Sequence, residues 1–255
     1  MEAKNVKIIF GTDEADRLIG TALDEAILAG GGDDVVRGDG GDDFIDGGDG
    51  WDALYGGDGN DVIQAGEGIF YIDGNAGDDT LIGGVGGGSI SGGAGHDLMI
   101  GGGESVVMRG EDGDDTIIIL QQSAGQFSLV CGGEGADVIV ASDGDDNIFA
   151  DGGNDYLDGG KGVNILGGGA GDDIFGIGPD SLTTINDFRG SFYGTGEKID
   201  LTRITDGWTF NDIMSHFTDE QAQFGRNAIF TYEGTKITLL GYSMHLLHPA
   251  DFIFD

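Results

Sequence analysis

The sequence predicts an all-β fold: a right-handed parallel β-roll, a β-solenoid with two nonapeptides per coil, followed by a C-terminal β capping region. Three observations predict it. A nine-residue motif recurs through about two thirds of the chain, its eighth position is always apolar, and no proline occurs before Pro179. Each motif is expected to form a six-residue turn and a strand of three residues whose middle side chain points inward. The absence of proline is what a ladder of paired strands requires.

The motif has the consensus GGxGxDxUx, in which U is apolar, and Gly56 to Gln64 (GGDGNDVIQ) is a clear copy. Copies follow one another without a break from Gly11 through the copy that begins at Gly110. The phase then slips by four residues, which we assign to an insertion at Ile119 to Gln122, and it continues from Ser123 through the copy that begins at Gly168. Glycine suits the turns because it adopts positive φ and lets backbones approach closely.

The eighth position tests this register, because it should face the core in every copy. It is occupied by Leu18, Ile27, Val36, Ile45, Leu54, Ile63, Ile72, Leu81, Ile90, Met99, Met108, Ile117, Val130, Ile139, Ile148, Leu157, Leu166 and Phe175. All of these residues are apolar. We therefore expect an N-terminal lead-in strand at 1–10, the β-roll at 11–176, and a C-terminal β cap at 177–255.

The composition limits the classes of partner. The chain holds 47 acidic and 11 basic residues and has a formal net charge of −36. Nucleic acids and anionic membrane surfaces need a basic footprint, so both are excluded as partners. No apolar stretch is long enough for a membrane span. The single cysteine, Cys131, allows no intrachain disulfide. Bound cations are the natural way to neutralise the carboxylates and stabilise such a fold.

With glycines and aspartates in phase over residues 11–176, the chain resembles the RTX (repeats-in-toxin) family, whose nonapeptide repeats bind Ca²⁺. The resemblance implies that position six supplies a carboxylate, that the glycine-rich turn supplies carbonyls, and that adjacent turns on one edge share each ion. Ca²⁺ takes six to eight oxygen ligands, and about ten Ca²⁺ ions are expected as cofactors. Because two motifs make one coil, turns on one edge are 18 residues apart.

One edge of the roll is predicted to carry an unbroken calcium ladder. Its position-six ligands are expected to be Asp43, Asp61, Asp79, Asp97, Asp115, Asp137, Asp155 and Asp173. The fourth-position glycines of the same turns are Gly41, Gly59, Gly77, Gly95, Gly113, Gly135, Gly153 and Gly171. The first turn on this edge departs from the pattern, since Leu23 replaces the glycine and Glu25 replaces the aspartate.

The other edge is acidic only toward its two ends. Its expected metal ligands are Asp16, Asp34, Asp52 and Asp146, with Asn164 in the last position. Between Asp52 and Asp146, position six is occupied by Phe70, Gly88, Val106 and Ser128. Two interpretations remain open: sequence drift in a stretch that the opposite ladder already holds, or a docking surface for a glycan or a protein.

Beyond Gly176 the glycine density falls, and strands are expected at 183–188, 198–201, 228–232 and 236–240, the last two as a hairpin. The phrases INDF (185–188), EKIDL (197–201) and terminal DFIF (251–254) are similar to the C-terminal part of serralysin-type and related type I secreted proteins. This resemblance implies a C-terminal export signal read by the type I secretion machinery and an extracellular location. Asp187 and Asp200 either bind one further Ca²⁺ or are solvated strand-end acids.

No catalytic site is expected. The sequence lacks the HExxH zinc motif of serralysins and the GxSxG nucleophile motif of the associated lipases. The resulting hypothesis is an extracellular calcium-binding module that folds on binding Ca²⁺ after type I secretion. The alternative is a polysaccharide-binding module for an alginate-like glycan, or an adhesion module, that forms the non-catalytic part of a larger secreted enzyme; alginate epimerases carry similar repeats.

Overall fold

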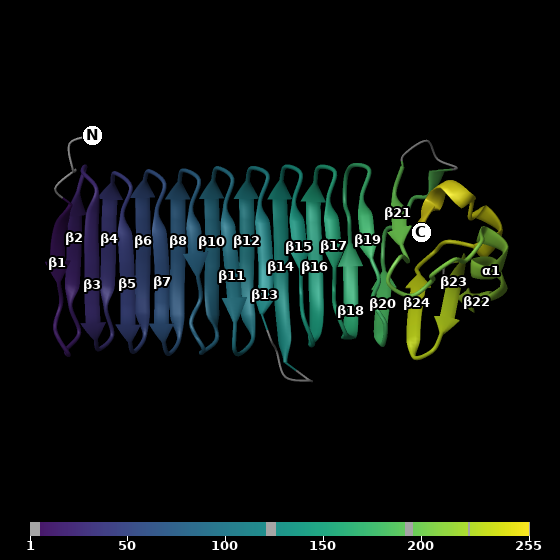
Figure 1. The fold of residues 1–255 in the computed structure, drawn as a ribbon, viewed down its shortest axis with the longest axis horizontal. Coiled ribbons are helices and arrows are strands. Elements are labelled where there is room, and N and C mark those ends of the chain that lie inside the picture. Colours follow the sequence, from purple (N-terminus) through teal and green to yellow (C-terminus); the bar gives the residue numbers. More distant parts are fainter. Residues whose placement is uncertain (1–5, 121–125, 192–195, 224, 255) are drawn as a thin grey trace. The chain divides into compact units, whose positions relative to one another are not determined.

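The computed structural model describes residues 6–120, 126–191, 196–223 and 225–254. The chain forms two compact units, Met1–Gln122 and Ser123–Asp255, and both are built mainly of β-strands (Figure 1). A helix long and apolar enough to cross a membrane is not found in the described parts of the chain.

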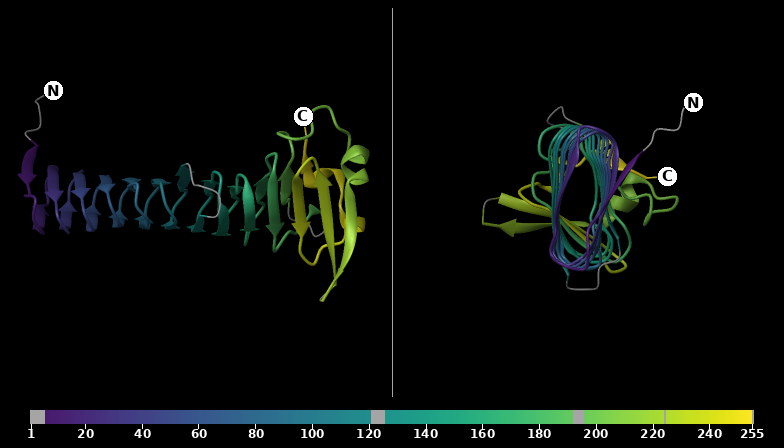
Figure 2. Two further views of the ribbon diagram at one scale, coloured as in Figure 1. Left: turned by 90° about the horizontal axis from the view of Figure 1, so that it is seen from below. Right: turned by 90° about the vertical axis from the view of Figure 1, so that its left-hand side faces the viewer.

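In the first unit, successive strands alternate between two parallel sheets. Sheet A contains, in spatial order, β1 (Lys7–Phe10), β3 (Glu25–Gly31), β5 (Phe44–Asp49), β7 (Val62–Glu67), β9 (Thr80–Ile82), β11 (Leu98–Gly102) and β13 (Thr116–Leu120). Sheet B contains β2 (Arg17–Thr21), β4 (Val35–Gly40), β6 (Asp52–Asp58), β8 (Phe70–Ala76), β10 (Gly88–Ala94) and β12 (Val106–Asp112). In the end-on view of Figure 2, the strands of this unit, purple to teal, form two facing layers joined by turns. The predicted parallel β-roll is confirmed.

The register repeats every 18 residues and places the eighth positions on top of one another. Ile27 pairs with Ile45, and Ile63 in turn pairs with Leu81. From Ile27 to Phe175, every eighth-position side chain is 0% exposed, whereas Leu18 in the first coil is half-buried. The predicted core is therefore confirmed, and its inward side chains pack within a layer of two facing sheets.

Two local expectations about the strands were wrong. Many strands are longer than three residues, because the ladder continues into the first glycines of the next motif; β5 runs from Phe44 to Asp49. Ile119 and Leu120 are not inserted residues, since they pair in register with Gly101 and Gly102. The remainder of the expected insertion, at 121–122, lies outside the described residues.

The second unit continues the same alternation and then adds the cap. One sheet contains β15 (Val138–Val140), β17 (Tyr156–Asp158), β19 (Ile174–Gly176), β21 (Lys198–Asp200) and β25 (Phe252–Ile253). The other contains β14 (Phe127–Glu134), β16 (Asp145–Gly152), β18 (Gly162–Gly167), β20 (Ser181–Ile185), β24 (Thr235–Leu239), β23 (Gly225–Tyr232) and β22 (Phe217–Ala222). The cap thus extends both sheets of its unit.

The expected hairpin is present, with β23 and β24 antiparallel and Glu233 and Gly234 at positive φ in the turn. The sequence did not predict helix α1 (Phe210–Ser215) or strand β22. A capping box begins α1, because the Thr209 side chain accepts from the Asp212 backbone and the Asp212 side chain accepts from the Thr209 backbone. Two short 3-10 helices follow, Met244–Leu246 and Pro249–Asp251.

Candidate calcium ladders

The turns that lead into sheet A and its counterpart β15, β17 and β19 are named edge A, and those that lead into the other sheet are named edge B. All eight fourth-position glycines predicted for edge A have φ between 100° and 141°. A side chain at these positions would be strained and would also meet the turn below; a Cβ on Gly59, for example, would collide with the carbonyl oxygen of Gly41. Glycine is therefore required here for both conformation and space.

The position-six carboxylates form a hydrogen-bonded row along edge A. In each step, the backbone N–H of one residue donates to Oδ1 of the residue 18 positions later: Asp43 to Asp61 at 2.8 Å, Asp61 to Asp79 at 2.7 Å, and Asp79 to Asp97 at 2.8 Å. The second unit repeats the pattern from Asp137 to Asp155 at 2.8 Å and from Asp155 to Asp173 at 3.0 Å. One oxygen of each carboxylate, Oδ1, is therefore used to hold successive coils together.

The second oxygen of these carboxylates is buried and has no hydrogen-bond donor. This holds for the Oδ2 atoms of Asp34, Asp43, Asp52, Asp61, Asp79, Asp97, Asp146, Asp155 and Asp173. Asp115 and Asp137 are equally buried, at 1% exposed each. A buried carboxylate oxygen without a partner costs free energy, so a row of them indicates a missing cation.

The first glycine of the motif makes room for this oxygen. A Cβ on Gly47 would lie 2.6 Å from Oδ2 of Asp52 and 2.7 Å from the carbonyl oxygen of Ala65 in the next coil. The same crowding by the position-six Oδ2 is found at Gly56, Gly74, Gly92, Gly132 and Gly168. The first-position glycine therefore creates a small space lined by a carboxylate oxygen and a carbonyl oxygen.

Burial also changes the acidity of these groups. It raises the pKa of Asp61 to about 6 and the pKa values of Asp79 and Asp155 to about 7, with neighbouring carboxylates adding to the effect. The pKa values of Asp43, Asp52 and Asp146 are raised to about 6 for the same first reason. A cation at Oδ2 would offset this penalty, because it favours the charged carboxylate.

Asn164 shows which other atoms surround such a cation. Its Oδ1 accepts from the backbone N–H of Asp146 at 3.0 Å, as an aspartate would, and its Nδ2 replaces Oδ2. Nδ2 donates to the carbonyl oxygens of Gly160 and Lys161 at 3.3 and 3.4 Å. Where position six is aspartate, these second- and third-position carbonyls would face the free Oδ2, and such an all-oxygen set fits Ca²⁺.

Among the residues that the structure describes, no group of three or more His, Cys, Asp or Glu side chains could hold a metal ion. The arrangement of the turns accounts for this result, since each turn brings one position-six carboxylate together with main-chain carbonyl oxygens and not a cluster of three such side chains.

In the middle of edge B, buried side chains other than carboxylates occupy position six. Phe70 is 3% exposed and Val106 is 2% exposed, and Ser128 is fully buried. The Phe70 ring fills the space beside the next turn, where a Cβ on Gly83 would lie 2.7 Å from its Cζ atom. These three side chains are therefore not available as docking residues, and the interpretation of the edge with its neighbouring insertion as a docking surface stays a prediction without them.

The first coil ends the ladders with threonine. Thr12 donates to Asp16 Oδ2 from its backbone N–H at 2.7 Å and from its hydroxyl at 2.8 Å. Thr21 holds Glu25 in the same way, at 3.0 Å to Oε2 and 2.5 Å to Oε1. The Asp16 oxygen predicted to bind metal is thus already hydrogen-bonded.

A second side-chain ladder runs along the exposed fifth positions, which the consensus left unspecified. It has the opposite direction: Asn60 N–H donates to Asp42 Oδ1, Asp78 N–H to Asn60 Oδ1, and His96 N–H to Asp78 Oδ1, at 3.0, 3.0 and 2.9 Å. The frequent Asp and Asn residues at position five are the sequence feature that predicts it.

These turns and sheets define a parallel β-roll whose edges carry candidate calcium ladders. The RTX calcium-binding nonapeptide repeat model matches in four copies, at residues 28–63, 55–90, 91–118 and 132–166. The roll of this chain is therefore made of RTX calcium-binding repeats, a repeat that occurs in secreted bacterial proteins.

Two solved structures are similar to the chain. The AlgE6R3 subunit of the Azotobacter vinelandii mannuronan C5-epimerase is 21% identical, with a TM-score of 0.35, over 56% of this chain and 80% of its own. The extracellular lipase LipA from Serratia marcescens is 18% identical, with a TM-score of 0.35, over 80% of this chain and 40% of its own. The chain thus spans less than half of that lipase. No curated protein matches it.

Proposed function

We propose that this chain is an extracellular calcium-binding module that folds when Ca²⁺ occupies the carboxylate rows of edges A and B. The observation that carries the proposal is the set of buried Oδ2 atoms without donors at Asp34, Asp43, Asp52, Asp61, Asp79, Asp97, Asp146, Asp155 and Asp173. Bound Ca²⁺ supplies the positive charge that these atoms lack. The aspartates hold the ion with Oδ2 while their Oδ1 atoms keep successive coils in register.

Calcium binding is coupled to folding in this proposal. In the unfolded chain the aspartates are far apart and hydrated, so the binding free energy becomes folding free energy. Inside a bacterium Ca²⁺ is scarce, and a net charge of −36 keeps the chain extended and suited to export by the type I secretion machinery. Outside, Ca²⁺ neutralises the rows and the roll folds.

Calcium removal tests the proposal. Excess EGTA should abolish most of the far-ultraviolet circular dichroism of β structure, and added Ca²⁺ should restore it cooperatively. Calorimetry on the same samples gives the number of bound ions. About ten are expected if each pair of adjacent turns on one edge holds one ion. A spectrum that is unchanged in EGTA would contradict the proposal.

A second candidate function is saccharide binding on the outer face of sheet B. Arg37, Tyr55 and Asp73 are neighbours on β4, β6 and β8, and Asp39, Gly57 and Asn75 form the adjacent row. Together they line a hollow of about 320 Å³. The hollow exists because Gly57 has no side chain, whereas its neighbours on the adjacent strands, Asp39 and Asn75, have one. Saccharide sites combine such polar groups with an aromatic wall.

The hollow favours uncharged sugars over the uronates of an alginate-like glycan. The Arg37 guanidinium lies 5.2 Å from the centre of the Tyr55 ring, while Asp39 and Asp73 face the same space. These two carboxylates accept hydrogen bonds from sugar hydroxyls and repel a polyanion. In saturating Ca²⁺, a glycan array should retain neutral oligosaccharides, and Tyr55→Ala should remove the binding while Phe44→Ala on sheet A should not. Retention of uronates alone, or no effect of Tyr55→Ala, would contradict this candidate.

A further inference from the structure

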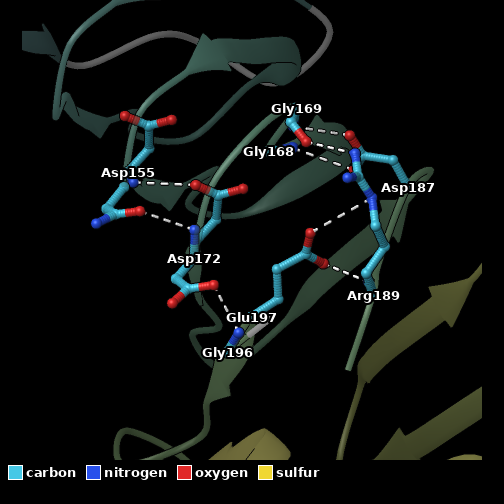
Figure 3. A network of polar contacts seen from close by, with 10 residues as sticks. Asp155, Gly168, Gly169, Asp172, Asp187, Arg189, Gly196 and Glu197 are labelled. Atoms are coloured by element: carbon cyan, nitrogen blue, oxygen red, sulfur yellow. Dashed lines mark hydrogen bonds and ion pairs between the residues drawn. The ribbon is translucent and has the colours of Figure 1, made fainter. Parts of the chain in front are cut away.

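The last turn of edge A holds a group of charges that the repeat pattern does not explain (Figure 3). Lys198 pairs with Ile174, so Glu197 follows Asp173 in the register of position six. The Glu197 side chain is fully buried, and its Oε2 accepts from the backbone N–H of Arg189. Its Oε1 has no hydrogen-bond donor and lies 3.8 Å from Arg189 Nε. Glu197 therefore occupies the next position-six place in the register, but its carboxylate accepts from the Arg189 backbone and faces the Arg189 side chain.

The Arg189 side chain reaches back to the preceding turn. Its Nη2 donates to the carbonyl oxygen of Gly169, the second residue of the final motif. Asn164 Nδ2 donates to the second-position carbonyl of its own turn, that of Gly160, at 3.3 Å. In two turns of the second unit, a protein N–H group thus meets the carbonyl that would otherwise face a cation.

The carboxylates around Arg189 support the same interpretation. Asp187 accepts from the backbone N–H groups of Gly168 and Gly169 at 3.1 and 2.8 Å, which joins its segment to the last turn. Asp173 and Glu197 are both fully buried; burial raises the pKa of Glu197 to about 7, and the charge of Asp173 adds to this effect. Arg189 favours the charged forms of both Asp173 and Glu197, and a guanidinium provides several donors in one plane for carboxylate and carbonyl oxygens.

We propose that the Arg189 guanidinium takes the place of a calcium ion in the last interval of edge A, between the turn 168–173 and Glu197. This interval is then closed by a protein cation and binds no Ca²⁺, so in the folded chain its closure does not depend on a bound ion. The assignment rests on the calcium-binding function proposed above, because it concerns the end of the same ladder.

Anomalous scattering from crystals grown in Ca²⁺ tests the proposal on the unmodified chain. Peaks are expected in the intervals from Asp61 to Asp79 and from Asp79 to Asp97, and none is expected between Gly169 and Glu197. A peak at Glu197 together with peaks at Asp79 would overturn the role proposed for Arg189 and leave the calcium ladder intact. The absence of peaks at every interval would instead refute the calcium ladder as a whole.

Native mass spectrometry of variants gives a second test. Arg189→Gln removes the cation and should raise the number of bound Ca²⁺ by one, while Arg189→Lys should keep the number found in the unmodified chain. Arg203→Gln is the matched control. Arg203 lies in the same unit and pairs at 2.6 Å with Asp158, which is not a position-six residue. An unchanged ion count in Arg189→Gln would overturn the proposal, and the crystal measurement decides if that variant does not fold.

Discussion

The two oxygens of each position-six carboxylate have separate tasks. Oδ1 of Asp97 accepts from the backbone N–H of Asp79, which fixes the spacing of two coils, while Oδ2 is left for a cation. An asparagine preserves the first task and replaces the second, as Asn164 shows. A single substitution can therefore separate ladder formation from metal binding.

Asp79→Asn should keep the roll folded but reduce the number of bound Ca²⁺ by one or two, because the new Nδ2 is a donor and cannot be a metal ligand. Calorimetric titration measures the number. Asp78→Asn is the control: position 78 is exposed, and Asn60 already accepts the equivalent hydrogen bond at 3.0 Å. Equal losses in both variants would show that overall charge, not the Oδ2 row, determines binding.

The first-position glycine makes a different prediction. Gly47→Ala places a Cβ 2.6 Å from Asp52 Oδ2, so that oxygen must move away from the ion. The affinity of the weakest calcium site should fall by about tenfold or more, which corresponds to at least about 1.4 kcal/mol. Gly31→Ala is the control, since its Cβ would have no neighbour closer than 3.7 Å and its φ is not positive. Similar calcium titrations for the two variants would contradict this role of Gly47.

At the scale of the element, strands β8, β10 and β12 show that a coil can be closed without ions. Their position-six residues, Phe70, Gly88 and Val106, pair in the same register as the aspartates of the other turns. The apolar side chains fill the volume that carboxylates occupy in the other turns. Stability in this stretch of edge B is therefore expected to come from packing, independent of calcium.

Phe70→Ala should destabilise the folded chain by about 3–5 kcal/mol, because it leaves a cavity in a packed interior. It should leave the number of bound Ca²⁺ unchanged, in contrast to Asp79→Asn. Chemical denaturation in saturating Ca²⁺ measures the first effect, and calorimetry the second. Ile69→Ala, next in sequence but 58% exposed, should change stability little. A loss of ions in Phe70→Ala would mean that this turn also contributes to a metal site.

The sequence predicted the periodic elements well and the cap in part: the four expected strands are present as β20, β21, β23 and β24, whereas α1 and β22 were not predicted. A strict period of nine fixes both the inward position, as at Ile63, and the stacking partner 18 residues away. The cap has no such period: α1 is only six residues long, and β22 carries polar residues on its exposed face. The inward direction of Phe70 could not be predicted either, because the repeat pattern specifies a carboxylate at position six and does not say where an apolar side chain would point.

At the scale of the whole molecule, protein groups close the ends of the candidate ladders. Thr12 and Thr21 satisfy the first carboxylate on each edge, and Asn164 and Arg189 meet turn carbonyls in the second unit. Repeat proteins need such terminal specialisation, because end repeats lack one neighbour. The repeat consensus could not predict these residues, because none of them belongs to it. Their shared role is seen in their hydrogen bonds.

The raised pKa values predict how the whole chain responds to pH. Burial holds the pKa of Asp61 at about 6 and those of Asp79 and Asp155 at about 7, above the ordinary value of 3.8. Between the ordinary pKa and the raised pKa values, the folded chain binds more protons than the unfolded chain. Its free energy of unfolding without calcium therefore falls as pH rises. The contribution is complete below the ordinary pKa and is lost as pH passes through 6 to 7.

Acidification should therefore partly replace calcium. In excess chelator, the β circular dichroism should increase as pH is lowered from 8 toward 5, a range that stays above the isoelectric point of about 4.1. As pH is lowered over the same range, the apparent calcium affinity should decrease, because protons compete with Ca²⁺ for the same carboxylate oxygens. Calcium binding therefore releases protons. Calorimetry in buffers of different ionisation enthalpy counts the released protons. Calcium binding that releases no protons at pH 6 would show that these carboxylates are already charged in the calcium-free chain, and that burial is not what couples their charge to folding.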